Sequence, residues 1–247
     1  MSKLVFTFDD GIRTHYDLVR PLLQKHGMTG TFFIPGEGPR RVWMRRMSGI
    51  AENDGADMQE GPLSWGEIAE MDKEGLEVGN HTLTHRNMPL DSRDLCHKEV
   101  ALLEHEFAEN DIRPAKTFCY PGYHAGPHVA SVLRELGFRF ARIGYLKDNP
   151  EAGEPKGGNR PENRSEVYYY TAGESDPMFV NSTGILNDWY GLDHFIEDVE
   201  NTPEGSVAVF TAHGFARKLR WDRLQRMVQY VAHNGHETIN FRDMPEA

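Results

Sequence analysis

Two adjacent carboxylates occupy a position from which they could perform acid–base or metal chemistry. Asp9 and Asp10 follow the apolar run at residues 3–8 directly and precede a glycine. A lone Asp-Asp-Gly is common in solvated turns, where glycine supplies a positive φ. Neighbouring carboxylates repel each other, however, and at the end of an apolar strand each needs a partner that favours its charged form.

The segment HTLTH at residues 81–85 supplies two imidazoles four residues apart. Both rings could meet one metal ion if the segment turns helically. The chain has 12 histidines, so chance provides roughly half such a pair and the spacing alone is a weak signal. A second pair, His124 and His128, enters a helix through a Gly-Pro break, and we expect it in a surface loop. His81 and His85 follow a predicted strand, and an acidic pair is available to complete their ligand set, so we predict that they bind metal.

Two imidazoles and one carboxylate fill three positions of a tetrahedral zinc site and leave the fourth open for water. The second carboxylate is then available as a general base beside the metal. We therefore interpret the acidic pair as one metal ligand and one base. The residue types alone leave open which of Asp9 and Asp10 takes which role.

Short β-rich runs alternate with helical patterns along the chain, which indicates parallel strands joined by crossovers. The predicted strands cover residues 3–8, 30–35, 76–80, 115–120, 138–143, 178–181, 206–212 and 238–241. The predicted helices cover residues 16–26, 64–73, 92–109, 127–136, 192–200 and 221–233. No GxGxxG follows the first strand, which disfavours a doubly wound open sheet. We predict one α/β domain over residues 1–247, an irregular (β/α) barrel with seven or eight parallel strands.

Barrel active sites lie at the carboxyl ends of the strands. The acidic pair follows the first predicted strand, HTLTH follows the third, YPGY at residues 120–123 follows the fourth, and His213 follows the seventh. Because all these ends meet at one face of a barrel, we expect these groups to converge on one site.

Two connections, residues 36–63 and 145–177, are longer than ordinary turns and are expected to be functional or disordered. The first follows the second strand and contains Arg40, Arg41, Arg45 and Arg46. Positive charge there could recognise an acidic substrate, whereas the alternative is an ordinary solvated loop.

Composition restricts the class of protein. A net charge of −11 over 247 residues argues against nucleic acid as the main partner. No apolar run approaches the ~18 residues of a membrane span. No signal peptide precedes the first strand, so we expect a cytoplasmic protein or a secreted domain whose leader has been removed. Cys96 and Cys119 form no CxxC pair and are expected to be buried free thiols.

Four segments resemble motifs of the polysaccharide deacetylases, carbohydrate esterase family four. TFDDG at residues 7–11 resembles the first motif and EVGNHTLTH at 77–85 the second. FCYPG at 118–122 resembles one version of the third, and FTAHG at 210–214 resembles the fifth. The resemblance extends over nearly the whole chain and implies a distorted (β/α) barrel, in agreement with the pattern of strands.

The resemblance also implies a function and a role for each site residue. The implied activity is metal-dependent removal of N-acetyl groups from an acetylated carbohydrate, a polysaccharide or oligosaccharide. The alternatives are an O-acetyl carbohydrate esterase and an amidohydrolase that acts on a small non-sugar amide. The implied metal is one divalent ion, zinc first, with cobalt, nickel or manganese as alternatives. The implied roles are catalytic base for Asp9, metal ligands for Asp10, His81 and His85, general acid for His213, and oxyanion stabilisation by the backbone N–H near Gly122 or Tyr123.

The chain departs from the family in two motifs. Many members carry an arginine early in the third motif that orients the base, whereas this chain has Cys119-Tyr120 there. The fourth motif is not recognisable. Arg139 or Arg142 could replace the missing charge, or both could be solvated at a strand end.

Overall fold

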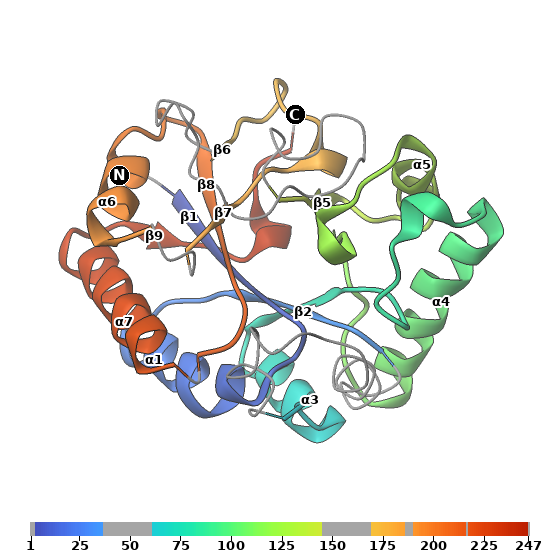
Figure 1. Cartoon of the computed structure of the whole chain (residues 1–247), viewed down its shortest axis with the longest axis horizontal. Helices are drawn as coiled ribbons and strands as arrows, with labels where there is room; N and C mark the ends of the chain where they lie inside the picture. Colours follow the sequence, from blue (N-terminus) through green and yellow to red (C-terminus); the bar gives the residue numbers. More distant parts are fainter. Residues whose placement is uncertain (1–2, 37–60, 145–168, 186–189, 216, 247) are drawn as a thin grey trace.

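A curled sheet forms the centre of the molecule, with helices around its outside (Figure 1). The computed structural model describes residues 3–36, 61–144, 169–185, 190–215 and 217–246. The strands are β1 Lys3–Asp9, β2 Thr31–Ile34, β3 Glu77–Asn80, β4 Thr117–Cys119, β5 Phe140–Arg142, β6 Tyr169–Tyr170, β7 Thr183–Gly184, β8 Val207–Ala212 and β9 Glu237–Thr238.

The strand order confirms the predicted distorted (β/α) barrel. Neighbouring strands follow the order β5-β4-β3-β2-β1-β8-β6, with β7 paired to β8 and β9 paired to β1. These pairings are parallel except for β6, which runs antiparallel to β8. One face of the curled sheet therefore surrounds an interior, and the parallel strands end together at one side of it.

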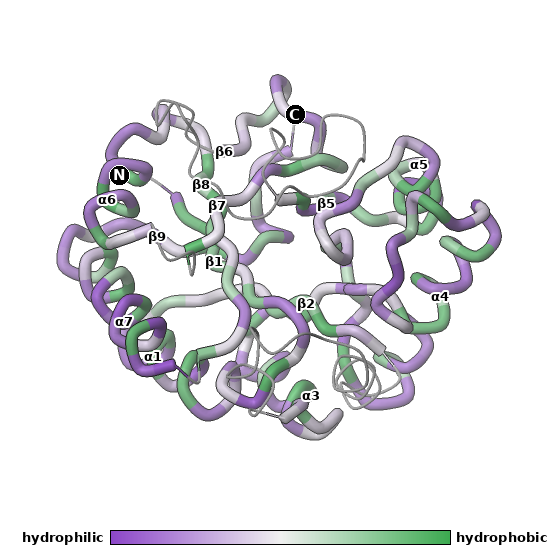
Figure 2. The backbone as a smooth tube through the Cα atoms, in the orientation of Figure 1, coloured by the Kyte–Doolittle hydropathy of each residue, from purple (hydrophilic) through white to green (hydrophobic). Residues whose placement is uncertain are grey.

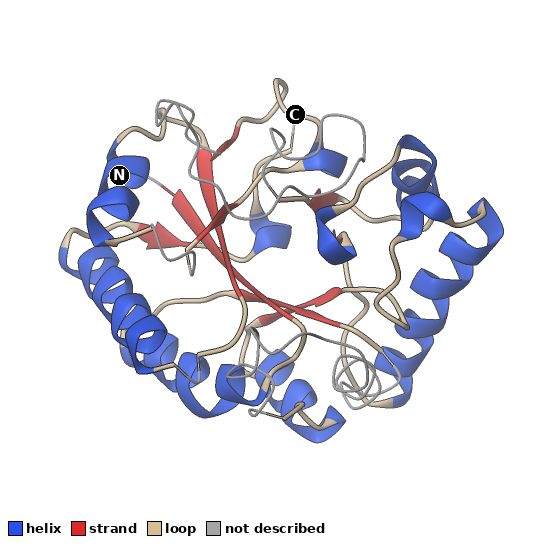
Figure 3. Ribbon diagram, viewed as in Figure 1, coloured by secondary structure: helices blue, strands red, loops and turns tan. Residues whose placement is uncertain are grey.

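The helices cover the outer face of the sheet (Figure 3). Their bounds are α1 Arg20–Lys25, α3 Trp65–Lys73, α4 Arg93–Glu109, α5 Pro127–Glu135, α6 Leu192–Glu200 and α7 Lys218–His233. A π-helical turn, His15–Val19, precedes α1, and a 3₁₀ turn, Pro121–Tyr123, follows β4. Among the described residues no helix is both long and apolar enough to cross a lipid bilayer.

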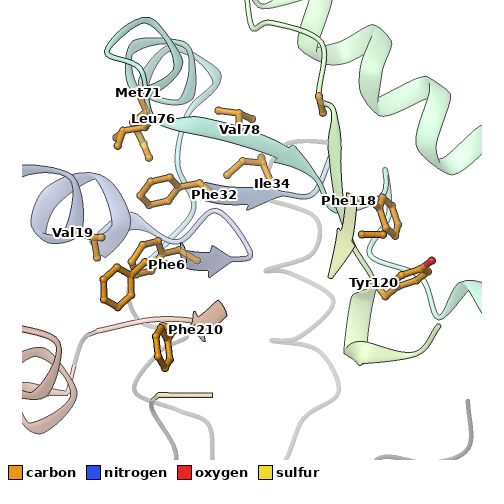
Figure 4. Packing of buried hydrophobic residues seen from close by; sticks show 14 of the residues in the cluster. Phe6, Val19, Phe32, Ile34, Met71, Leu76, Val78, Phe118, Tyr120 and Phe210 are labelled. Carbon is orange, nitrogen blue, oxygen red and sulfur yellow. The ribbon is translucent and has the colours of Figure 1, made fainter. Parts of the chain in front are cut away.

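Side chains alternate between the two faces of each strand, and this alternation decides which residues reach the barrel interior. In β1, Leu4, Phe6 and Phe8 belong to the large core between sheet and helices, whereas Val5 belongs to the smaller interior core. Figure 2 shows hydrophobic residues along the central strands and alternating hydropathy on the outer helices. Figure 4 shows side chains of β1, β2, β3 and β8 packed together in the large core. By the same period of two, the carboxylate of Asp9 belongs to the interior.

Two predicted strands differ in the structure: the strand at residues 178–181 is replaced by a turn, and the strand at residues 238–241 is shifted to Glu237–Thr238. Residues 178–181 were expected to form a strand, but Pro177–Phe179 forms a 3₁₀ turn and only Val180 bridges to Arg142. Pro177 has no N–H to donate, and the Asp176 side chain caps the turn by accepting from the Met178 N–H. The four arginines at positions 40–46 lie outside the described residues.

Candidate metal and catalytic site

The two aspartates diverge because the backbone changes conformation between them. Asp9 is the last residue of β1, lies opposite Phe33 of β2 and is 1% exposed. Asp10 donates its N–H to the Phe33 carbonyl at 3.1 Å but has a φ of 77°, a left-handed value that few non-glycine residues adopt. One carboxylate therefore stays in the barrel interior, and the other turns toward the end of β3.

Asp10, His81 and His85 come together as the sequence predicts. The Asp10 Oδ1 atom lies 3.5 Å from His81 Nε2 and 3.1 Å from His85 Nε2. Ligands about 2.0–2.1 Å from a tetrahedral zinc ion are about 3.3 Å apart, so this spacing fits such an ion. One ligand atom from each of the three residues lies within 4.8 Å of the others, and the donor set of two imidazoles and one carboxylate suits zinc.

A carbonyl of the neighbouring strand orients the first histidine. His81 Nδ1 donates to the Cys119 carbonyl at 2.8 Å, which leaves Nε2 to face Asp10. Such a hydrogen bond fixes both the tautomer and the ring plane of a metal-binding histidine. The arrangement therefore presents a lone pair where a metal would need one.

A buried arginine is the charge partner of Asp9. Arg142, the last residue of β5, is fully buried, and its Nη2 donates to Asp9 Oδ2 at 2.5 Å. Its Nη1 donates to Ser182 Oγ at 2.9 Å. The alternative that both arginines are solvated is therefore wrong, because Arg142 is buried. Arg139 is exposed and pairs with Glu246.

Two aromatic rings hold the arginine in place. The guanidinium carbon lies 5.4 Å from the ring centres of both Phe33 and Tyr123, within the range of cation–π attraction. The Phe33 ring fits because the facing residue of β3 is Gly79, where an added Cβ would lie 2.5 Å from the ring. The guanidinium is therefore fixed by packing as well as by hydrogen bonds.

The arginine keeps Asp9 ionised. Burial alone raises the pKa of Asp9, but the charges of Arg142, His213 and His81 outweigh it and hold the pKa below its ordinary value. Cys119, where the resemblance to the third motif implies an arginine, is a buried free thiol whose pKa is raised by burial. Its Sγ lies 2.7 Å from Arg142 Nη2 and 3.9 Å from Asp9 Oδ2. The small thiol thus leaves space for the guanidinium of Arg142, which extends from β5.

His213 lies at the solvent-exposed side of the site. Its Nε2 is 3.7 Å from Asp9 Oδ2 and 3.9 Å from Asp10 Oδ2, and its side chain is 39% exposed. His15, which the sequence did not single out, donates from Nε2 to the His213 carbonyl at 3.0 Å. Burial lowers the pKa of His15 to about 4, so the ring is neutral and remains a donor to that carbonyl. The buried His15 thus fixes the backbone of the partly exposed His213.

The turn after β4 distinguishes the two predicted oxyanion donors. The Tyr123 N–H donates to the Tyr120 carbonyl at 3.0 Å, so it is already engaged within the turn. Gly122 is exposed and has a φ of 62°. Gly122 therefore stays the predicted donor. The tyrosine side chain contributes in another way, by stacking on Arg142 and lying edge-on to His213 with ring centres 6.4 Å apart.

The second HxxxH pair is not part of this site. Among the described residues, the groups that could hold a metal contain neither His124 nor His128. Both are half-buried, in the turn before α5 and in its first turn.

Comparisons with known proteins show the family and the fold of the chain. A family model described as polysaccharide deacetylase matches residues 2–141. A search of curated proteins finds no match to the chain.

Several solved structures share the fold at low sequence identity. The Bc1960 peptidoglycan N-acetylglucosamine deacetylase has a TM-score of 0.61 and 16% identity, with 98% of this chain and 87% of that chain covered. A family 4 carbohydrate esterase from Streptomyces lividans has a TM-score of 0.58 and 15% identity, with 100% and 97% covered. BA3943 from Bacillus anthracis, described as a CE4 family pseudoenzyme, has a TM-score of 0.59 and 14% identity, with 98% and 65% covered.

The geometry predicts that Arg142→Met damages both stability and the reaction of the site. The substitution leaves the Asp9 charge buried without its arginine partner, which should lower the free energy of unfolding by about 3–5 kcal/mol. Asp9 is the base that the resemblance implies, so loss of its charge partner should lower kcat for acetyl hydrolysis by at least about 10²-fold. Urea unfolding and steady-state kinetics measure the two effects.

Arg139→Met is the matched control, because that arginine is exposed and should change the free energy of unfolding by less than about 0.5 kcal/mol. Arg142→Lys keeps the charge but cannot bond Asp9 and Ser182 with one planar fork, so an intermediate kcat is expected. A normal kcat in Arg142→Met would show that Asp9 needs no charge partner.

Proposed function

The chain belongs to the polysaccharide deacetylase family, and from this membership we propose that it is a metal-dependent hydrolase that removes N-acetyl groups from a saccharide. The observation that carries the proposal is the convergence of five groups on one face of the barrel. An Asp-His-His cluster lies beside a buried, ionised aspartate and a partly exposed histidine. These are the groups that hydrolysis of an acyl bond requires: a metal site, a base and an acid.

Asp10, His81 and His85 are the residues that would hold the divalent ion, with zinc the best match to the donor set and cobalt, nickel or manganese as alternatives. When bound, such an ion polarises the acetyl carbonyl and lowers the pKa of water. The protein supplies three donor atoms at suitable separations and a histidine tautomer that the Cys119 carbonyl fixes.

Asp9 is the proposed general base. It receives a proton from the attacking water, whose oxygen forms a bond to the acetyl carbon. The carboxylate is suited to this role because Arg142 keeps it ionised and fixes its orientation. Its second oxygen, Oδ1, is buried and has no hydrogen-bond partner among the described residues, so a lone pair is available for a proton.

The oxyanion and the leaving group need separate donors. We assign the oxyanion contact to the Gly122 backbone N–H. We assign protonation of the leaving amine to His213, whose Nε2 lies 3.7 Å from the Asp9 carboxylate at the exposed side of the site. As the C–N bond breaks, the amine takes that proton and acetate is released.

An O-acetyl carbohydrate esterase is the second candidate function. The same groups would serve both reactions, and the solved relatives include a protein named as a deacetylase and one named as a carbohydrate esterase. The two functions differ in the leaving group, because an amine must be protonated to leave whereas an alkoxide needs less help. An amidohydrolase acting on a small non-sugar amide is the third candidate function.

We predict that the purified chain releases acetate from N-acetylated saccharides and that metal removal stops the reaction. Chelation should abolish activity, and added zinc or cobalt should restore it. The measurement is acetate release across N-acetylated saccharides, O-acetylated saccharides and small acetamides, with metal content determined on the same sample. Full activity in a verified metal-free sample would falsify metal dependence, and release from O-acetyl esters alone would favour the esterase.

Asp9→Asn should separate catalysis from metal binding. The variant keeps Asp10, His81 and His85, so it should retain the metal, but it should lose about 10²–10⁴-fold in rate because the base is gone. Asp10→Asn is the matched control and should lose metal. Metal analysis and kcat are measured on folded protein of both variants. The opposite pattern would mean that the two aspartates have exchanged roles.

His213→Ala should discriminate between leaving groups. Because an amine leaves only when protonated, the variant should lose much of its kcat/KM on an N-acetyl amide. It should lose much less on an activated acetate ester, whose phenolate leaves without help. Parallel losses on the amide and the ester would remove His213 from the acid role.

A further inference from the structure

The metal-binding loop has a backbone that its own sequence does not favour. Thr82 has a φ of 65° and His85 a φ of 54°, both in the left-handed region that non-glycine residues seldom adopt. Such conformations persist only where the surrounding structure imposes them. The source of that constraint decides whether the ligands are in position before a metal arrives.

Glu99 of α4 supplies much of the constraint. It lies on the inward face of α4 among Cys96, Val100 and Leu103, where a helix in contact with the core ordinarily places an apolar residue, and it is 5% exposed. A carboxylate is retained at a buried position only when polar groups satisfy it. The groups that satisfy Glu99 come from the metal-binding loop.

Three hydrogen bonds join Glu99 to residues between the two histidines. Thr84 donates from its backbone N–H to Glu99 Oε2 at 2.8 Å and from its hydroxyl to Oε1 at 2.9 Å. The Leu83 N–H donates to the Glu99 carbonyl at 2.9 Å. These contacts fix the residue immediately before His85.

A second set of contacts fixes the start of the loop. Asn80 Oδ1 accepts from the Thr82 N–H at 2.9 Å, and Asn80 Nδ2 donates to Glu104 Oε1 at 2.8 Å and to the Val100 carbonyl at 3.2 Å. Glu104 in turn accepts from the Ala115 N–H at 3.0 Å. Both ends of the turn between His81 and His85 are therefore attached to one helix.

We propose that Glu99 is a positioning residue that sets the affinity of the site for its metal, by holding the 82–85 turn so that His85 Nε2 faces Asp10. The proposal rests on the proposed function, because it takes Asp10, His81 and His85 to be the metal ligands. Glu99 acts through Thr84, to which both of its carboxylate oxygens are bonded. Without it, the turn must become ordered as the metal binds, and that ordering lowers the affinity.

The test is the zinc affinity of the full-length metal-free protein, measured by competition with a chromophoric chelator. Removal of a group that orients a ligand typically weakens metal binding by about 10–100-fold, and this is expected for Glu99→Ala. Glu99→Gln keeps one oxygen acceptor and should lose less. Thr84→Val removes the hydroxyl donor and keeps the N–H donor, so its effect should be small and should largely disappear in combination with Glu99→Ala.

Glu109→Gln is the matched control, because this carboxylate lies on the same helix but is 63% exposed and far from the turn in sequence. The Co²⁺ absorption spectrum of each variant supplies a second readout, since a displaced His85 changes the ligand geometry. If Glu99→Ala does not fold, Glu99→Gln and Thr84→Val carry the comparison.

A lower unfolding midpoint of the metal-free protein with unchanged zinc affinity would overturn the proposal, because it would make Glu99 a residue of the fold alone. Weaker zinc binding with a midpoint close to that of Glu109→Gln would support it. A wild-type chain that binds zinc but releases no acetate would overturn the proposed function, and the affinity shift would still decide the role of Glu99.

Discussion

The site depends on one buried ion pair, between Arg142 and Asp9. A carboxylate in a barrel interior destabilises the fold unless a positive charge and hydrogen bonds compensate its lost hydration. Here one guanidinium supplies both. The same guanidinium needs its own surroundings, which are the Ser182 hydroxyl and the rings of Phe33 and Tyr123. One charge on β1 therefore has contacts that depend on three other segments: the end of β5, the turn after β4 and the residue before β7.

Adjacent carboxylates can take different roles because their surroundings differ. Period-two alternation places Asp9 in the interior, where Arg142 lies, and the left-handed backbone at Asp10 directs the next carboxylate to His81 and His85. Each negative charge then has a separate partner, and the mutual repulsion is offset on both sides. The same arrangement keeps Asp9, the proposed base, close to the three proposed metal ligands.

Backbone strain is concentrated where the site needs it. Five described residues other than glycine have positive φ, and four of them, Asp10, Thr82, His85 and Tyr123, lie in the loops that form the site. Long-range contacts hold these conformations: Phe33 for Asp10, α4 for the HTLTH turn and Arg142 for the Tyr123 ring. Similar folds include a protein described as a pseudoenzyme, so activity must be argued from such residues and contacts and not from the barrel.

The sequence alone determined the elements that depend on local pattern. Apolar runs and helical periods indicated β1, β3, β8 and the larger helices. The resemblance to family motifs indicated Asp10, His81 and His85 as neighbours. Local pattern could not show whether Arg139 or Arg142 supplies the positive charge next to Asp9. In the predicted strand at residues 138–143 they are three positions apart and would point to opposite faces. Only the pairing of Arg142 with Cys119 of β4 shows which face is the interior.

The sequence also could not reveal other contacts of the site residues, because these contacts depend on strand pairing and packing. Asp9 is 133 residues from Arg142 in sequence, His15 is 198 residues from His213, and Glu99 looks like any helical acid until α4 packs beside the loop. Each of these contacts is decided by register and packing, which bring together residues that no local period connects. The sequence indicated the carboxylates and imidazoles of the candidate site, and the tertiary structure decided which groups surround and orient them.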